Sequence, residues 1–161
     1  MSANSGKIIK ILFVCHGNIC RSPMAEFVMK DLAEKAGIGD RVYIASAATS
    51  SEEIGSPVHR GTVKELEKRG ISCAGKYAVK LERADYAYYD HIVGMDIYNI
   101  RNMLRLFGGD PENKVRLLMS FAGESRDVDD PWYTRDFLTA YSDIFSGCSA
   151  LLKVVRDELR P

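Results

Sequence analysis

The chain has 161 residues, of which 46% are hydrophobic and 27% are charged, a composition typical of one globular domain. Its 22 lysines and arginines balance its 22 aspartates and glutamates, so the formal net charge is zero. A general nucleic-acid binder needs an excess of positive charge, and the composition therefore argues against nucleic acid as a partner. Any site for an anionic ligand must be built from a few positioned groups.

The sequence also indicates where the protein works. No run approaches the roughly 18 uninterrupted apolar residues of a membrane helix, and the apolar residues after the polar start lack the length and cleavage site of a signal peptide. We therefore expect a cytoplasmic protein with no membrane span and a disordered tail over residues 1–6. In that compartment cysteines stay reduced, so a special one would serve as a nucleophile or a redox sensor.

Strands and helices alternate along the chain. Residues 7–14 carry a nearly unbroken β-prone apolar run, which is typical of a strand buried on both faces. A helix is expected next, with Ser22 as N-cap, Pro23 at its first position and Gly37 at its end. Residues 41–46 form the second predicted strand.

The second half of the chain continues this pattern. Residues 57–70 are predicted to form a helix and residues 71–89 to be irregular. A third strand is expected over 91–94, followed by a helix that Asp96 caps. A fourth strand over 114–119 and a loop over 120–132 complete this part. The apolar residues of the last predicted helix keep a spacing of three and four: Leu138, Tyr141, Phe145, Cys148, Leu152, Val155 and Leu159.

This alternation predicts an α/β fold. We expect a single domain over residues 1–161, with a parallel sheet that has helices on both faces. Ligands of such sheets bind at the carboxyl ends of the strands, near the switch in strand order. The turn after the first strand is therefore the expected site.

That turn places five residues between a cysteine and an arginine: Cys15-His16-Gly17-Asn18-Ile19-Cys20-Arg21-Ser22. A short loop leading into a helix can point successive backbone N–H groups inward and cradle a tetrahedral oxyanion. Gly17 and Asn18 allow the tight curvature, and Arg21 can offer two parallel donors to phosphate oxygens. Such a positive field favours a Cys15 thiolate, to which Ser22 can donate. The alternative is a buried strand-end thiol beside a solvated arginine.

A longer stretch around this turn resembles the signature of the low-molecular-weight protein tyrosine phosphatases: Val14-Cys15-His16-Gly17-Asn18-Ile19-Cys20-Arg21-Ser22-Pro23-Met24-Ala25-Glu26. Residues 46–50 resemble the end of the family's second strand, 91–96 its third strand and helix start, and 130–132 its acid loop. The resemblance covers nearly the whole chain. It implies a flavodoxin-like, phosphotyrosine phosphatase I-like fold, in which a doubly wound sheet of four parallel strands in the order 2-1-3-4 is flanked by helices. It also implies hydrolysis of phosphotyrosine in proteins, or of small aryl phosphates, with no metal or other cofactor.

Thiolate attack on an aryl phosphate requires a proton for the departing phenolate. The loop before the last helix offers Asp127, Asp129 and Asp130, and Pro131 keeps the residue before it out of helical backbone. The resemblance assigns the general acid to Asp130. Without it, Asp129 remains a competitor, and a turn-initiating Asp-Pro pair with no chemistry is the alternative.

The resemblance also implies residues around the phosphate. Trp132 and Tyr133 are expected to form the rim against which the substrate ring stacks, unless they only cover a helix end. His16 should form the opposite wall, or be a surface histidine. The remaining residues are assigned to phosphate binding or to the support of the loop: Gly17, Asn18, Ile19, Cys20, Ser22 and Ser46.

Two positions depart from the family's pattern. Glu52 stands near a loop position where some members present an aromatic or apolar residue, and an acid there could repel acidic phosphopeptides or select basic ones. The segment Ala74-Gly75-Lys76 stands where many relatives carry a histidine that supports the phosphate loop. If Gly75 is that position, the hydrogen-bond network of the loop lacks one member.

Cys20 has two compatible interpretations. It can be a small apolar filler, and the resemblance implies that oxidised Cys15 could be trapped as a Cys15–Cys20 disulfide. His59 and His91 have no partners at ligand spacing, so no metal site is predicted. The sequence also lacks GxGxxG and GxxxxGK[ST].

The predicted activity is therefore a metal-independent protein-tyrosine-phosphatase reaction through a phosphocysteine on Cys15, with Arg21 and the loop amides binding phosphate and Asp130 as acid and base. The expected partner is a tyrosine-phosphorylated protein such as a tyrosine kinase, and the enzyme is expected to be a monomer. The alternatives are a thioredoxin-linked arsenate reductase on the same fold, a phosphotyrosine-binding or redox-sensing module without turnover, and a cysteine phosphocarrier. The first needs further cysteines after the second helix, where only Cys73 stands.

Overall fold

The computed structural model describes residues 6–161, so the expected tail over residues 1–6 lies outside the described part except for Gly6. Its strands form one parallel sheet in the order β2-β1-β3-β4, which confirms the predicted order. The strands are β1 (Ile9–Cys15), β2 (Val42–Ala48), β3 (His91–Gly94) and β4 (Val115–Leu117).

The central strand β1 explains why the first apolar run is continuous. Ile11 and Phe13 face one side of the sheet and pack in the larger core cluster, whereas Leu12 and Val14 face the other side and pack in the smaller one. All four are at most 2% exposed. Both faces of β1 are therefore covered, as the sequence predicted.

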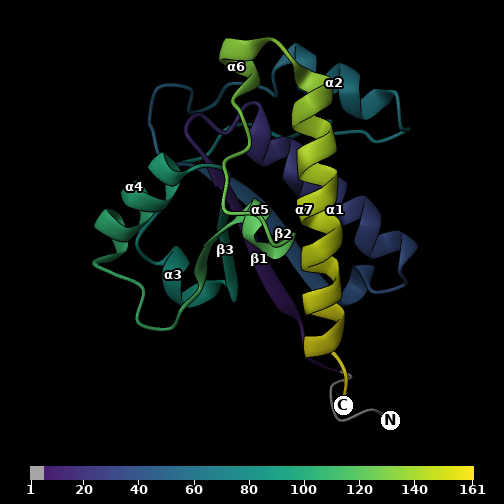
Figure 1. Ribbon diagram of the computed structural model, residues 1–161, viewed down its shortest axis with the longest axis vertical. Coiled ribbons are helices and arrows are strands. Elements are labelled where there is room, and N and C mark those ends of the chain that lie inside the picture. The colour runs from purple at the N-terminus through teal and green to yellow at the C-terminus, as the bar shows by residue number, and fades with distance from the viewer. Residues whose placement is uncertain (1–5) are drawn as a thin grey trace.

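Helices lie on both sides of this sheet (Figure 1). α1 (Arg21–Lys35) and α7 (Phe137–Glu158) pack together on one side, and α3 (Asp85–Tyr88) and α4 (Ile97–Phe107) lie on the other. The remaining helical segments are η1 (Gly39–Arg41), α2 (Arg60–Glu67), α5 (Leu118–Phe121) and α6 (Pro131–Thr134). Within residues 6–161, no helix combines the length and apolar character needed to span a membrane.

Two helices begin at other residues than predicted. α1 begins at Arg21 with Cys20 as N-cap, because the Ser22 hydroxyl contacts the Cys15 thiol instead of capping the helix. α2 begins at Arg60 rather than near Pro57, which instead forms a bridge with Tyr77. The cap of α2 is His59, whose Nδ1 accepts a hydrogen bond from the Gly61 N–H at 3.0 Å.

Other boundaries also differ from the predictions. β2 ends two residues later than expected. β4 ends at Leu117, directly before α5 begins at Leu118, so the predicted strand over 114–119 is too long. Short helices occur in the segments expected to be irregular or looped, namely α3, α5 and α6. In contrast, the helix capped by Asp96 is confirmed, since Asp96 and Asn99 form a capping box.

The prediction of which α7 residues form its buried apolar stripe was only partly right. Cys148 and Val155 are buried, but Leu138 and Phe145 are 58% and 43% exposed. Small residues on the packed face were missed: a Cβ atom on Gly147 would come within 2.5 Å of the Leu118 side chain, so glycine lets α7 approach α5 closely. The buried residues of this helix are Ala140, Ile144, Gly147, Cys148, Leu151 and Val155.

Candidate active site

The loop over residues 15–22 leaves β1 at the carboxyl edge of the sheet and leads into α1. Cys15 pairs in register with Ala48 of β2, and Val14 pairs with Gly94 of β3. The loop therefore lies where the chain turns to opposite sides of β1, as expected for the ligand site of a doubly wound sheet.

Three donors converge on the Cys15 sulfur, which is almost fully buried. Its Sγ atom lies 3.0 Å from the Ser22 hydroxyl, and it accepts from the backbone N–H groups of Asn18 and Ser22 at 3.3 and 3.4 Å. Hydrogen bonds of this kind favour a thiolate, which is the nucleophilic form of cysteine.

Other backbone donors of the loop have nothing to bind. Throughout residues 6–161, no acceptor is found for the N–H groups of Gly17, Ile19 and Cys20. Unpaired N–H groups at the start of a helix of 15 residues, beside a buried guanidinium, have the geometry and charge that an oxyanion site requires.

Asn18 gives the loop its curvature. Its φ is 58°, in the left-handed region, whereas Gly17 is not in that region, so only one of the two predicted residues supplies the turn. The Asn18 amide donates to Ser22 Oγ at 2.7 Å and to Ser46 Oγ at 2.9 Å, and it accepts from the Val79 N–H at 3.1 Å. This buried side chain therefore fixes both the loop and the hydroxyl beside the sulfur.

The hydrogen bonds behind the loop do not include Gly75, which has no side chain, but they do include its neighbour Lys76. Ser46 Oγ donates to Glu26 Oε1 at 2.6 Å, and Lys76 Nζ donates to the Ser46 carbonyl at 2.9 Å. Lys76 also lies 3.6 Å from Glu26. Burial lowers the pKa of Lys76, although Glu26 opposes that shift. Glu26 and Lys76 therefore support Ser46 from behind the loop.

Arg21 is 2% exposed and is held by groups from two other segments. Its Nη1 donates to Asp96 Oδ2 and to the Val128 carbonyl, both at 2.8 Å, and its Nη2 lies 3.4 Å from Asp130 Oδ2. Burial opposes the charged form, but Cys15, Asp130 and Asp96 outweigh it and raise the pKa of Arg21. The guanidinium is therefore a fixed cation beside the sulfur.

The acid loop separates the candidate acids. Asp130 lines the cavity and caps α6, accepting from the Trp132 N–H at 3.1 Å. Asp127 accepts from the Ile97 N–H at 3.0 Å, at the start of α4. Asp129 is exposed and does not line the cavity. Of the three, only Asp130 is placed to transfer a proton to a ligand bound over Cys15.

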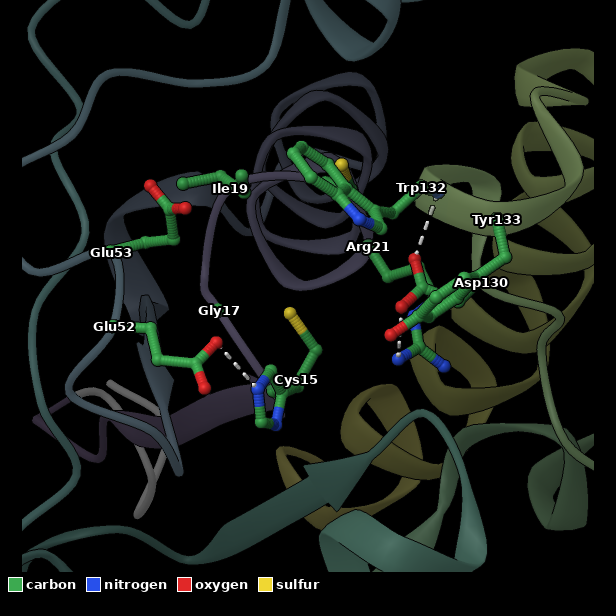
Figure 2. A pocket seen from close by; sticks show the side chains of 11 residues that line it. Cys15, Gly17, Ile19, Arg21, Glu52, Glu53, Asp130, Trp132 and Tyr133 are labelled. Carbon is green, nitrogen blue, oxygen red and sulfur yellow. Dashed lines mark hydrogen bonds and ion pairs between the residues drawn. The ribbon is translucent and has the colours of Figure 1, made fainter.

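These groups surround a cavity of about 120 Å³. Figure 2 shows Glu52 and Glu53 on one side of it, Asp130, Trp132 and Tyr133 on the other, and the Cys15 sulfur between them. The other lining residues are His16, Gly17, Ile19, Cys20 and Arg21, so Asn18, Ser22 and Ser46 act from behind the surface.

The predicted substrate walls differ in how firmly they are held. Trp132 is 46% exposed and meets the His59 ring edge to face with the centroids 5.7 Å apart, and Tyr133 is 80% exposed. His16 is exposed, and its Nε2 lies 3.3 Å from Glu52 Oε2. An aromatic ring can therefore lie between a tryptophan on one side and a polar wall on the other.

Cys20 is a buried thiol on the floor of the cavity. Burial raises its pKa to about 12, and the charges of Cys15 and Asp130 act in the same direction. Cys20 is therefore a neutral thiol beside the candidate nucleophile. Both cysteines are free, as are Cys73 and Cys148.

Four residues of this site were missed as functional groups. Asp96 was predicted only as a helix cap, although a cap at the carboxyl edge of β3 also faces the loop after β1. Glu53 is adjacent to the predicted residue Glu52, which could have indicated it. Glu26 and Lys76 lie in segments that resemble the family, but neither was predicted to have a role. Within the described residues, no group of three or more His, Cys, Asp or Glu side chains is arranged to hold a metal ion.

The sequence and the structure were compared with those of known proteins. The family model described as low molecular weight phosphotyrosine protein phosphatase matches residues 10–160. The chain is 37% identical over 153 residues to the low molecular weight protein-tyrosine-phosphatase YfkJ of Bacillus subtilis (strain 168), covering 94% of this chain and 98% of the relative.

Solved structures give the same result. The crystal structure of YfkJ matches with a TM-score of 0.92 over 96% of this chain and 98% of that chain. The low molecular weight protein tyrosine phosphatase SP-PTP of Streptococcus pyogenes has 38% identity and a TM-score of 0.81, with 91% and 92% covered. The drosophila arginine phosphatase DARP has 29% identity and a TM-score of 0.82, with 91% and 98% covered.

The substitution Asp96→Asn tests how Arg21 is held. Asparagine also caps helices, so the start of α4 should be kept, but the buried Arg21 loses its closer charged partner and the melting temperature should fall by several degrees. We expect the dissociation constant for inorganic phosphate to rise about tenfold in isothermal titration calorimetry, because a misplaced guanidinium loses a charge-assisted hydrogen bond.

Asp127→Asn is the matched control, since that carboxylate contacts the start of the same helix without contacting Arg21. Its phosphate affinity should stay close to that of the wild type. Unchanged or tighter phosphate binding by Asp96→Asn would show that Asp96 does not orient the guanidinium.

Proposed function

The chain belongs to the low molecular weight phosphotyrosine protein phosphatase family, and we propose that it hydrolyses phosphotyrosine in proteins, and small aryl phosphates, through a phosphocysteine intermediate. One observation carries the proposal. The Cys15 sulfur, with three donors around it, lies on the floor of a cavity that also presents Arg21, unpaired loop N–H groups and Asp130.

In the first step the Cys15 thiolate attacks phosphorus in line with the leaving oxygen. The loop N–H groups and Arg21 stabilise the equatorial oxygens, where charge accumulates. Arg21 reaches this geometry by exchanging its 3.4 Å contact with Asp130 for a phosphate oxygen, while Asp96 and the Val128 carbonyl keep hold of Nη1.

That exchange also prepares the acid. Without ligand, Asp130 Oδ2 lies 3.4 Å from Arg21, and Asp130 Oδ1 accepts from the Trp132 N–H. When a phosphate oxygen takes over the Arg21 contact, Asp130 Oδ2 is free to face the leaving oxygen of the substrate. Asp130 then gives its proton to the tyrosine oxygen as the P–O bond breaks.

In the second step Asp130, now ionised, takes a proton from a water molecule that attacks the phosphocysteine. The S–P bond breaks, inorganic phosphate leaves, and Cys15 returns as a thiolate that Ser22 stabilises from 3.0 Å. Because the free enzyme needs a thiolate and a protonated carboxyl together, activity should have a bell-shaped pH dependence with a mildly acidic optimum.

The aromatic wall supports an aryl substrate. A phosphotyrosine ring above Cys15 would lie beside Trp132, which His59 holds edge to face. We extend the proposal to a tyrosine-phosphorylated protein as partner, such as a tyrosine kinase, and to a monomeric enzyme of the cytoplasm. Since DARP is described as an arginine phosphatase, phosphoarginine is the comparison substrate.

We expect Cys15→Ser to abolish hydrolysis of a small aryl phosphate, because a serine hydroxyl is not ionised at the working pH. Steady-state rates would be measured across pH with a chelator present, and Cys73→Ser, which removes a thiol outside the cavity, is the control. Residual turnover above a trace in Cys15→Ser would refute the mechanism. Hydrolysis of phosphoarginine in preference to phosphotyrosine would refute the substrate class.

The substitution Asp130→Ala tests the acid by its dependence on the leaving group. Turnover should fall roughly 100-fold or more on phenyl phosphate, whose phenolate needs a proton, and much less on an activated nitrophenyl phosphate. Asp129→Ala is the matched control and should retain turnover on both. Equal losses on both substrates in Asp130→Ala would place the acid elsewhere.

We also propose that Cys20 protects the nucleophile from oxidation. Peroxide would convert the Cys15 thiolate to a sulfenic acid, and the Cys20 thiol would attack its sulfur, releasing water and forming a Cys15–Cys20 disulfide. Wild-type enzyme treated with peroxide should regain most of its activity in dithiothreitol, whereas Cys20→Ser should lose activity irreversibly at the same dose. Equal recovery of the two proteins would contradict this role.

A further inference from the structure

One wall of the cavity carries two neighbouring carboxylates, Glu52 and Glu53, from the loop between β2 and α2 (Figure 2). We call this pair the acidic wall. It faces the aromatic wall formed by Trp132 and Tyr133 across the Cys15 sulfur. A substrate entering the cavity therefore meets two neighbouring carboxylates on one side, and two aromatic rings with the single carboxylate of Asp130 on the other.

Both carboxylates are positioned by local contacts. Glu52 Oε2 lies 3.3 Å from His16 Nε2, and the Glu52 N–H donates to Ser50 Oγ at 3.1 Å. The Glu53 carboxylate accepts from Ser56 Oγ at 2.9 Å, and its Cγ lies 3.6 Å from the place of a Cβ on Gly17. The acidic wall thus rests directly on the phosphate-binding loop.

The acidic wall has little positive charge of its own to balance it. Among residues 6–161, neither carboxylate forms an ion pair with a lysine or an arginine. The nearby guanidinium of Arg21 is already engaged by Asp96 and Asp130. Among the basic side chains of the described residues, only that of His16 contacts Glu52, and none contacts the Glu53 carboxylate.

A bound phosphate adds negative charge beside this wall and leaves no cation to spare, because Arg21 turns to the phosphate oxygens. A cation brought by the substrate itself would relieve the repulsion. The side chain of a neighbouring lysine or arginine is long and flexible enough to reach a wall at the mouth of the cavity while the phosphotyrosine ring fills the centre.

We propose that the acidic wall is a specificity site that binds a lysine or arginine next to the phosphotyrosine, so that basic phosphotyrosyl segments are the preferred substrates. This inference rests on the proposed function. Glutamates flanking the phosphotyrosine are disfavoured, because they face Glu52 and Glu53 with like charge.

The test uses three phosphotyrosyl peptides that differ only in the two residues on each side of the phosphotyrosine: lysines, glutamines or glutamates. The full chain should give a kcat/KM for the lysine peptide about threefold to tenfold above that for the glutamine peptide, with the glutamate peptide lowest. The preference should shrink as ionic strength rises, because the cation remains near solvent.

The variants are Glu52→Gln and Glu53→Gln, singly and together, with Glu82→Gln as the control that removes an equal charge away from the cavity. In the double variant the lysine-to-glutamate ratio should collapse toward one, whereas Glu82→Gln should keep the wild-type ratio. Each ratio is taken within one variant, so any change in its basal turnover cancels.

Equal kcat/KM for the three peptides, or a ratio that survives the double substitution, would overturn the acidic wall as a specificity site. A small aryl phosphate separates this result from a failure of the proposed function. If the wild type hydrolyses the aryl phosphate without a charge preference among peptides, only this inference fails. If it hydrolyses none of them, both fail.

Discussion

The burial of one guanidinium organises this molecule. Arg21 is nearly inaccessible, and a buried charge costs several kcal/mol unless other groups replace its lost water. Those groups come from far along the chain: Asp96 after β3, and the Val128 carbonyl and Asp130 before α6. The first residue of α1 is thereby tied to the segments that surround it. The contacts that stabilise the buried Arg21 charge also hold Asp130 across the cavity from the Cys15 sulfur. The same interactions therefore stabilise the carboxyl edge of the sheet and arrange its candidate catalytic groups.

The residues alone predicted the alternation of strands and helices and the loop between Cys15 and Ser22, because apolar periodicity and the residue types of a turn are local signals. The strand order, which depends on long-range pairing, came from the family resemblance. Prediction from the residues failed where a side chain had a distant partner. Ser22 is a good N-cap by type, but its hydroxyl is committed to the sulfur, so the helix starts one residue before it. The support from Glu26 and Lys76 joins residues 20 to 50 positions apart, which no local pattern encodes. In α7, the buried face could not be predicted from the large apolar residues alone, because it includes Gly147, where the helix approaches Leu118 closely.

The neutral net charge hides a strong local separation. At the bottom of the cavity lie a fixed cation and unpaired N–H groups, and at its mouth lie carboxylates of the loop after β2. A protein with a net positive charge would attract any anion from a distance. Here an anion is attracted only once it has entered the cavity far enough to approach Arg21 and the unpaired N–H groups. Asn18 preserves the arrangement, since its amide connects the loop to β2 and to the Val79 backbone at once. If the acidic wall acts as proposed, substrates would be selected by how deeply their phosphate reaches and by the charge of the residues beside the phosphotyrosine, rather than by overall attraction.

The anchoring of the acid loop bears on how the site is kept dry. Val128 donates its N–H to the Met95 carbonyl at 2.8 Å and accepts from Arg21, and two residues later Asp130 is fixed as the cap of α6. A segment held at such short intervals cannot sweep across the cavity like a hinged cover. Under the proposed function, the substrate itself would have to expel water from the cavity, as its ring and flanking residues fill the space between the acidic and the aromatic walls. A ligand too small to fill this space would react with more water around it, and the water would screen the charges of the site.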